Sequence, residues 1–210
     1  SGRCGERVWC AGRMETEIEA KFLDVDHDAI RAKLRALGAE LQHPERLMRR
    51  RQFDFPDMRL DERGAWLRLR DEGDRITLSY KRWEGHAING TKEASVVVSD
   101  VDAMVSILTA LGLVEKSYQE TRRETWRLGE SEVVIDTWPW IPTLAEVEAP
   151  TEQGVKDTAA KLGFDMEQAL FGGAVRAYQR YYDVSREEID QCREMTFGPV
   201  PEWLEAKRRR

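Results

Sequence analysis

Glu15-Thr16-Glu17-Ile18-Glu19-Ala20-Lys21-Phe22-Leu23 is the stretch of sequence from which the fold can be worked out. Successive side chains of a β-strand point to opposite faces, so Glu17, Glu19 and Lys21 share one face of this stretch. Carboxylates that lie side by side on a strand repel each other unless a cation or a basic partner offsets them. The stretch therefore predicts a β-strand whose charged face lies against positive charge.

Similar alternation recurs along the chain and predicts about eight strands in all. Turn residues at 71–74 and 129–130 indicate two hairpins between consecutive strands. Because the strands follow one another without the strand–helix alternation of a doubly wound sheet, we expect an α+β fold, a closed eight-stranded antiparallel β-barrel with helices packed outside. The expected strands are residues 15–23, 47–55, 65–71, 74–82, 91–98, 115–127, 131–138 and 143–149.

Helices are expected between and after these strands. Asp26 or Asp28 can cap the first helix, and Ser99 or Asp100 can cap the second. Two more helices are expected at residues 151–163 and 174–182. Their apolar faces would cover the outside of the barrel.

The charged side chains of the strands are sorted by sign. Acidic residues concentrate on the first and last strands, whereas basic residues such as Arg68, Arg70 and Lys81 lie on the middle strands. In a closed barrel of about eight strands, these faces can all point into a bore wide enough for one small ligand. Carboxylates without a neighbouring His or Cys suit Mg²⁺ or Mn²⁺, and arginine and lysine suit phosphate oxygens. The pattern predicts a site for phosphoryl chemistry.

Composition narrows the class of protein. The chain has 210 residues, of which 34% are charged, and a formal net charge of −6. An acidic chain is a poor candidate for nucleic-acid binding, and no apolar run approaches the length of a membrane-spanning helix. The three cysteines, Cys4, Cys10 and Cys192, form no C-x-x-C motif, so we expect neither a zinc site nor a disulfide framework. We expect a cytoplasmic protein with no membrane partner.

The chain is expected to divide into three parts. Residues 1–13 lack the apolar segment of a secretory signal and are interpreted as a non-native or disordered tail, with Met14 as the natural start. Residues 14–183 form the barrel domain, and residues 184–210 form a helical or extended tail. Within that tail, the part from Phe197 onward carries two prolines and is expected to be loosely ordered.

At this point the sequence resembles the CYTH, or triphosphate tunnel metalloenzyme, superfamily, which includes class IV adenylyl cyclases, thiamine triphosphatases and inorganic triphosphatases. The family hallmark Glu-x-Glu-x-Lys is present as Glu17-Ile18-Glu19-Ala20-Lys21. Segments similar to later family strands follow in the family's order, over about residues 14–182. These segments are Leu67-Arg68-Leu69-Arg70, Thr77-Leu78-Ser79-Tyr80-Lys81 and Ala145-Glu146-Val147-Glu148.

The resemblance implies a division of roles inside the barrel. Glu17, Glu19, Glu146 and Glu148 would hold one or two Mg²⁺ or Mn²⁺ ions, with Glu93 and Asp136 as further ligand candidates. The phosphates would be cradled by Arg68, Arg70, Lys81 and Arg123. Lys21 would contact phosphate or tune a water. The catalytic candidates are Lys21, Glu17 and Glu148.

Two features depart from the family pattern. Thr91 and Ser95 flank Glu93 where the family often has charged residues, and Thr121 stands where it has a lysine. The run Arg49-Arg50-Arg51 must put at least one arginine inward. We take Arg51 as a phosphate-binding candidate, while the pattern leaves open which of the three face the bore.

Three functions compete at this stage. We favour hydrolysis of a triphosphate, which would be inorganic tripolyphosphate, a nucleoside triphosphate or thiamine triphosphate. The first alternative is a class IV adenylyl cyclase that forms cyclic AMP and pyrophosphate from ATP. The second is a non-catalytic polyphosphate-binding module, which four glutamates argue against. The expected partner is a small-molecule triphosphate, and a homodimer is left open.

Overall fold

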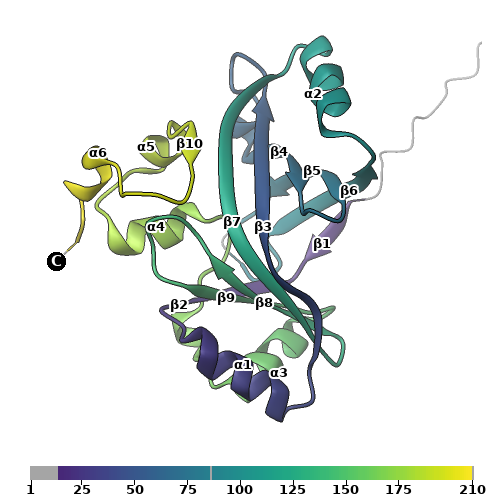
Figure 1. The fold of residues 1–210 in the computed structure, drawn as a ribbon, viewed down its shortest axis with the longest axis vertical. Helices are drawn as coiled ribbons and strands as arrows, with labels where there is room; N and C mark the ends of the chain where they lie inside the picture. The colour runs from purple at the N-terminus through teal and green to yellow at the C-terminus, as the bar shows by residue number, and fades with distance from the viewer. Residues whose placement is uncertain (1–13, 86, 210) are drawn as a thin grey trace, which may run out of the picture.

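The computed structural model describes residues 14–85 and 87–209. One antiparallel sheet wraps into a nearly closed barrel with helices outside it (Figure 1). The strand order is β1-β6-β5-β4-β3-β7-β8-β9-β2. Because β1 (Glu15–Glu17) and β2 (Glu19–Leu23) are consecutive pieces of one run, the ring closes where they adjoin. The expectation about residues 1–13 lies outside the described residues.

The barrel confirms the predicted fold class with one difference in strand count. The first predicted strand is split at Ile18, where the chain changes partner from β6 to β9. There the backbone N–H of Ala149 donates to the Ile18 carbonyl at 3.1 Å, and Glu19 N–H donates to Ile88 at 3.0 Å. The remaining barrel strands are β3 (Glu40–Asp54), β4 (Ala65–Asp71), β5 (Ile76–Trp83), β6 (Thr91–Val98), β7 (Val114–Leu128), β8 (Ser131–Thr137) and β9 (Leu144–Glu148).

Two helices cover the lower outside of the barrel in Figure 1. They are α1 (His27–Ala36), capped by the Asp26 side chain, and α3 (Glu152–Leu162), capped by Thr151. Leu34 and Leu162 are fully buried with the outward-facing Val133 and Val147 of β8 and β9. Each such side chain stabilises the fold by roughly 1.5–3 kcal/mol. The hydrophobic core therefore lies outside the barrel, which leaves the inner face free for charge.

Further helices lie at the ends of the barrel. Asp100 caps α2 (Val101–Ala110), which connects β6 to β7 near the top of Figure 1. Short 3₁₀ helices lie at η1 (Asp61–Arg63) and η2 (Met166–Gln168). The fourth predicted helix is α4 (Val175–Tyr181), on the side of the barrel near β7.

The C-terminal residues fold back beside α4 and β7 (Figure 1). They form α5 (Arg186–Asp190), β10 (Glu194–Met195) and α6 (Glu202–Glu205). Leu204 is fully buried in a cluster with Tyr178 and Tyr182, and Arg209 N–H donates to the Tyr181 carbonyl at 2.8 Å. The expectation of a loosely ordered end is therefore wrong for the residues described up to 209, because Leu204 anchors them.

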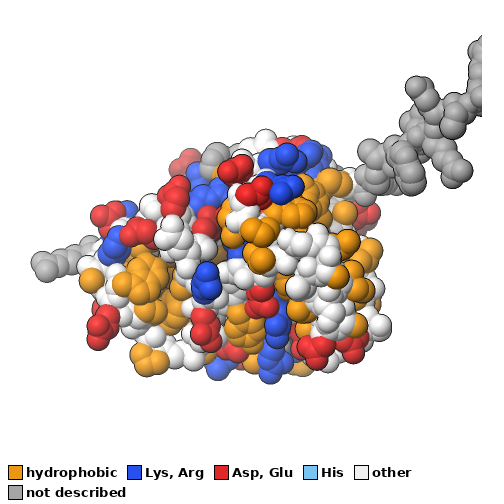
Figure 2. All heavy atoms as spheres, turned by 90° about the horizontal axis from the view of Figure 1, so that it is seen from above, with side chains coloured by type: hydrophobic (Ala, Val, Ile, Leu, Met, Phe, Trp, Pro, Cys, Tyr) orange, Lys and Arg blue, Asp and Glu red, His pale blue; other side chains and the backbone are white. Residues whose placement is uncertain are grey.

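The outer surface mixes all side-chain types. Figure 2 shows acidic and basic side chains interspersed with hydrophobic ones on the face seen from above. Among the described residues, no helix has the length and apolar character needed to cross a membrane.

Candidate functional site

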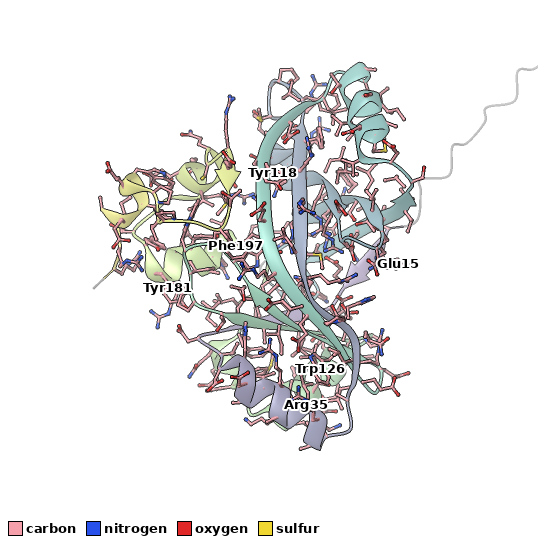
Figure 3. The ribbon with its side chains drawn as sticks, viewed as in Figure 1. Glu15, Arg35, Tyr118, Trp126, Tyr181 and Phe197 are labelled. Atoms are coloured by element: carbon pink, nitrogen blue, oxygen red, sulfur yellow. The ribbon has the colours of Figure 1, made fainter. Side chains whose placement is uncertain are left out.

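A cavity of about 700 Å³ occupies the inside of the barrel. Alternate side chains of the strands project into it, as the parity of the sequence predicted. Figure 3 shows how densely side chains fill the space between the strands. The charged residues brought together here include Glu17, Glu19, Lys21, Arg50, Arg68, Arg70, Lys81, Glu93, Arg123, Glu132, Glu146 and Glu148.

The acidic side chains that line the cavity are here called the acidic wall. β1 and β2 supply its centre. Lys81 Nζ lies 2.6 Å from Glu17 Oε1, and Lys21 Nζ lies 2.5 Å from Glu19 Oε1. Glu17 Oε2 is buried without a hydrogen-bond partner. Burial and the neighbouring Glu93 carboxylate raise the pKa of Glu17 to about 8. A raised pKa means that the ionised form of Glu17 is disfavoured, and a further cation beside it would stabilise that form.

The last two strands extend the acidic wall. Strand register places Glu148 beside both Glu19 and Glu132. Burial and these two neighbouring carboxylates raise the pKa of Glu148 to about 7. The sequence analysis did not predict Glu132 as a site residue. Glu132 has the same parity on its strand as Val134 and Asp136, so a strict count of alternation would have identified it.

The basic wall lies on β3, β4 and β7. Strand register places Arg50 opposite Arg70, and both face the cavity, where like charges repel. Arg50 is 4% exposed, and its Nε and Nη2 have no hydrogen-bond partner. Burial, together with Arg123, lowers the pKa of Arg50 well below its ordinary value. Burial and Arg70 likewise lower the pKa of Arg68 to about 10, and its Nε is also buried without a partner.

The structure settles which member of the arginine run faces inward. Arg51, the candidate chosen from the sequence, lies on the outer face, where Nη1 is 3.0 Å from the Glu115 carboxylate. Its guanidinium also lies 5.9 Å from the centre of the Tyr118 ring. The expectation that Arg51 faces the cavity is therefore wrong; Arg50 lines it instead, with its guanidinium 4.6 Å from the centre of the Trp138 ring.

Several predicted site residues are already bound to one another. Arg123 donates to both oxygens of Asp136, at 2.9 and 2.5 Å, and to Glu146 at 2.9 Å. Asp136 is fully buried, so its two oxygens serve to hold Arg123. Burial opposes ionisation of Glu146, but Lys21 and Arg123 together hold its pKa well below the ordinary value. Arg70 is fixed in a similar way by Glu72, at 2.6 and 2.9 Å.

The acidic wall carries the oxygen donors that a divalent cation would need. Within residues 14–85 and 87–209, no three carboxylate, imidazole or thiolate groups converge as a ready-made metal site. This is because Glu17, Glu19 and Glu146 turn toward Lys81, Lys21 and Arg123. The donor set still fits Mg²⁺ or Mn²⁺: it is all oxygen, Glu17 Oε2 is orphaned, and the pKa values of Glu17 and Glu148 are raised.

Comparisons with known proteins relate the sequence to a family and the fold to solved structures. The sequence matches the family described as the CYTH domain over residues 15–182. Similar solved structures include a protein from Pyrococcus horikoshii OT3, with 21% identity and a TM-score of 0.64, covering 77% of this chain and 98% of that one. A candidate adenylate cyclase from Vibrio parahaemolyticus has 16% identity and a TM-score of 0.70, covering 80% and 99%. No curated protein sequence matches the chain.

A third structural relative has a name that includes an activity. It is a candidate adenylyl cyclase from Hippeastrum, reported to have a dominant triphosphatase activity, with 16% identity, a TM-score of 0.52 and coverage of 83% of this chain and 95% of that one. At these identities the solved structures establish the shared fold. The family match itself spans β1 to α4, which carry every charged residue of the two walls. The chain belongs to the CYTH domain family.

Proposed function

We propose that the protein is a metal-dependent triphosphatase that binds its substrate inside the barrel. One observation carries the proposal: Arg50 and Arg68 present buried guanidinium N–H groups without partners to a cavity whose opposite wall is acidic. A buried, unpaired charge is costly, and an anion in the cavity removes that cost. A triphosphate with a divalent cation satisfies the basic and acidic walls together.

The phosphate oxygens would be held by arginines that the barrel has already fixed. Arg70 is held by Glu72, and Arg123 is held by Asp136. Arginines fixed in advance lose little rotamer freedom on binding and can form paired hydrogen bonds to phosphate. Lys81 adds a point charge between Glu17 and Glu93.

The acidic wall would hold the cation. Glu17, Glu19 and Glu148 are the ligands that the structure supports best, with Glu93 and Glu146 beside them. When bound, Mg²⁺ or Mn²⁺ would neutralise charge on the phosphoryl oxygens. Asp136 is better placed to orient Arg123 than to bind metal, since both its oxygens are taken.

The hydrolytic step needs a group that accepts a proton from water. We assign to Glu148 the acceptance of that proton as water attacks the terminal phosphorus; its pKa is raised to about 7 in the metal-free protein, and a bound cation would lower it. The carboxylates of Glu146 and Glu19 raise the pKa of Lys21 despite its burial. Lys21 therefore stays protonated and serves as a phosphate contact. The sparse cysteine content leads us to place this activity in the cytoplasm.

Hydrolysis is favoured over two other functions. A module that only binds anions has no need of an acidic wall in which two glutamates are held away from their ordinary pKa. A cyclase would use the same walls but would attack the α-phosphorus with a ribose hydroxyl. The Hippeastrum relative, whose reported dominant activity is that of a triphosphatase, supports hydrolysis as the first choice.

The test compares Glu17→Gln with a matched control on the same strand. Turnover of tripolyphosphate with Mg²⁺ or Mn²⁺ is expected to fall by about 10²–10³-fold in Glu17→Gln, because a fixed electrostatic contact is lost. Glu15→Gln, which alters an exposed glutamate outside the cavity, is expected to behave as wild type. Full activity in Glu17→Gln would remove Glu17 from the site.

A further inference from the structure

Arg50 is held in the cavity in a different way from its basic neighbours. Arg70 is bound by Glu72, and Arg123 is bound by Asp136. Among the described residues, no carboxylate pairs with Arg50, although Arg50 is only 4% exposed and its Nε and Nη2 are buried. The long Arg50 side chain therefore needs another contact to fix the direction in which its guanidinium points.

That contact is the indole of Trp138, the residue that directly follows β8. The Arg50 guanidinium carbon lies over the Trp138 ring, 4.6 Å from its centre. Trp138 is 8% exposed and lines the same cavity. The electron-rich face of an indole attracts a cation, and the attraction is strongest where water is excluded. Trp138 therefore holds the guanidinium of Arg50 at one place on the cavity wall.

An indole can hold a guanidinium without using its hydrogen-bond donors. A carboxylate partner accepts from the guanidinium, as Glu72 accepts from Nε and Nη2 of Arg70. The face of the Trp138 ring accepts no such bond, so Nε and Nη2 of Arg50 remain without partners. Arg50 is thus fixed in position and still has N–H donors to offer to phosphate oxygens.

The Trp138 ring is itself held from two sides. Its Nε1–H donates to Asp136 Oδ2 at 3.3 Å, the same oxygen that accepts from Arg123. On the other side, the fully buried Tyr178 of α4 donates its hydroxyl to the Pro139 carbonyl at 2.9 Å and so anchors the next residue of the chain. The indole therefore keeps a set orientation relative to the barrel strands.

We propose that Trp138 is a positioning residue, which holds the Arg50 guanidinium where it meets a phosphate of the substrate. The inference rests on the proposed function for the identity of the ligand, a triphosphate. It adds an uncharged residue, outside the two charged walls, on which phosphate binding depends. The indole also offsets part of the cost of burying the charge of Arg50 without a carboxylate partner.

A double-mutant cycle with Arg50 separates positioning from packing. In the wild-type background, Trp138→Leu is expected to lower kcat/KM for tripolyphosphate by about tenfold, mainly through KM, because Arg50 loses the contact that places it. In the Arg50→Met background the same change is expected to lower kcat/KM by about twofold at most, since no guanidinium remains to be placed. A tryptophan that only filled the core would cost the same factor in both backgrounds.

Two further variants complete the experiment. Trp138→Phe keeps an aromatic face but loses the donor to Asp136, so it is expected to recover part of the kcat/KM that Trp138→Leu loses. If Trp138→Leu does not fold, Trp138→Phe takes its place in the cycle, with an expected loss of about threefold that disappears in the Arg50→Met background. Trp140→Leu is the matched control on the same loop. The Trp140 side chain lies outside the cavity, so this variant is expected to keep the wild-type kcat/KM.

Equal losses in the two backgrounds, or no loss in Trp138→Leu, would overturn the inference. Calorimetric titration of tripolyphosphate with Mg²⁺ separates it from the proposed function. If wild type binds tripolyphosphate without hydrolysing it, the triphosphatase assignment fails, and the same cycle measured in affinity decides on Trp138. A loss of affinity that is present in the wild-type background and absent from Arg50→Met supports the positioning role, and an equal loss in both rejects it.

Discussion

Arg50 is the residue on which the proposed phosphate site depends most. Three consecutive arginines of a strand must alternate between faces, but the sequence does not fix which face is which. The adjacent Phe53 and Phe55 share the parity of Arg49 and Arg51, and Phe53 is buried in the core between β3 and α2. That parity therefore belongs to the outer face. Burial of Phe53 was the physical fact needed to choose Arg50, and it was not visible in the sequence.

Replacing Arg50 by an uncharged chain of similar length separates binding from stability. Arg50→Met is expected to lower kcat/KM for a triphosphate by about 10²–10³-fold. Without ligand, the same variant is expected to be at least as stable as wild type in urea unfolding, because a buried unpaired charge has been removed. Arg51→Met is the matched control on the outer face. A ligand-free Arg50→Met protein that is markedly less stable, with normal turnover, would contradict the assignment.

The raised pKa of Glu17 predicts how the free energy of unfolding of the metal-free protein changes with pH. A glutamate in the unfolded chain loses its proton near 4.5, whereas Glu17 in the folded protein keeps it until about pH 8. Between these values the folded state binds more protons, so its free energy of unfolding falls as the pH rises. Unfolding in the presence of a chelator at pH 5 and pH 8 is expected to show this fall in wild type. Glu17→Gln is expected to show a smaller fall, and an unchanged slope would reject the raised pKa.

At the scale of elements, strand alternation and helix caps predicted most of the fold. Asp26, Asp100 and Thr151 cap helices close to the expected positions. The start of β3 was missed because residues 40–46 do not alternate and include Pro44. The register with β7 shifts between Leu41 and His43 and again between His43 and Arg46, across this proline. Proline is tolerated in a strand at such irregularities, so tertiary pairing overrode the local signal.

The turn between β4 and β5 holds one of the phosphate-binding candidates in place. Glu72 is 2% exposed and accepts from Arg70 and Arg75, at 2.6 and 2.9 Å. Glu72→Gln is expected to lower the free energy of unfolding by about 3 kcal/mol, since Arg70 loses its counter-charge in a largely buried site, whereas the half-exposed Arg75 adds little. It is also expected to raise KM for tripolyphosphate more than it lowers kcat. Glu115→Gln, at an exposed pair, is the control and is expected to cost at most about 1 kcal/mol.

At the scale of the whole molecule, the fold places its hydrophobic core outside a charged cavity. The sequence showed the charges and their parity, and the family resemblance ordered them into two walls. The sequence did not show that residues after 182 complete the cavity. β10 is only two residues long, and Leu204 lies in a stretch without periodicity. Short segments that are ordered by tertiary packing leave little local signal.

The central claim is that this cavity hydrolyses a triphosphate at its terminal phosphorus. The most direct measurement follows the purified chain by ³¹P NMR with ATP and, separately, with tripolyphosphate, in Mg²⁺ or Mn²⁺ and then in chelator. Orthophosphate is expected as the first product, formed only when metal is present. Cyclic AMP with pyrophosphate would instead make the protein a cyclase, and an unchanged spectrum with both substrates and both metals would contradict the claim that this barrel is an enzyme.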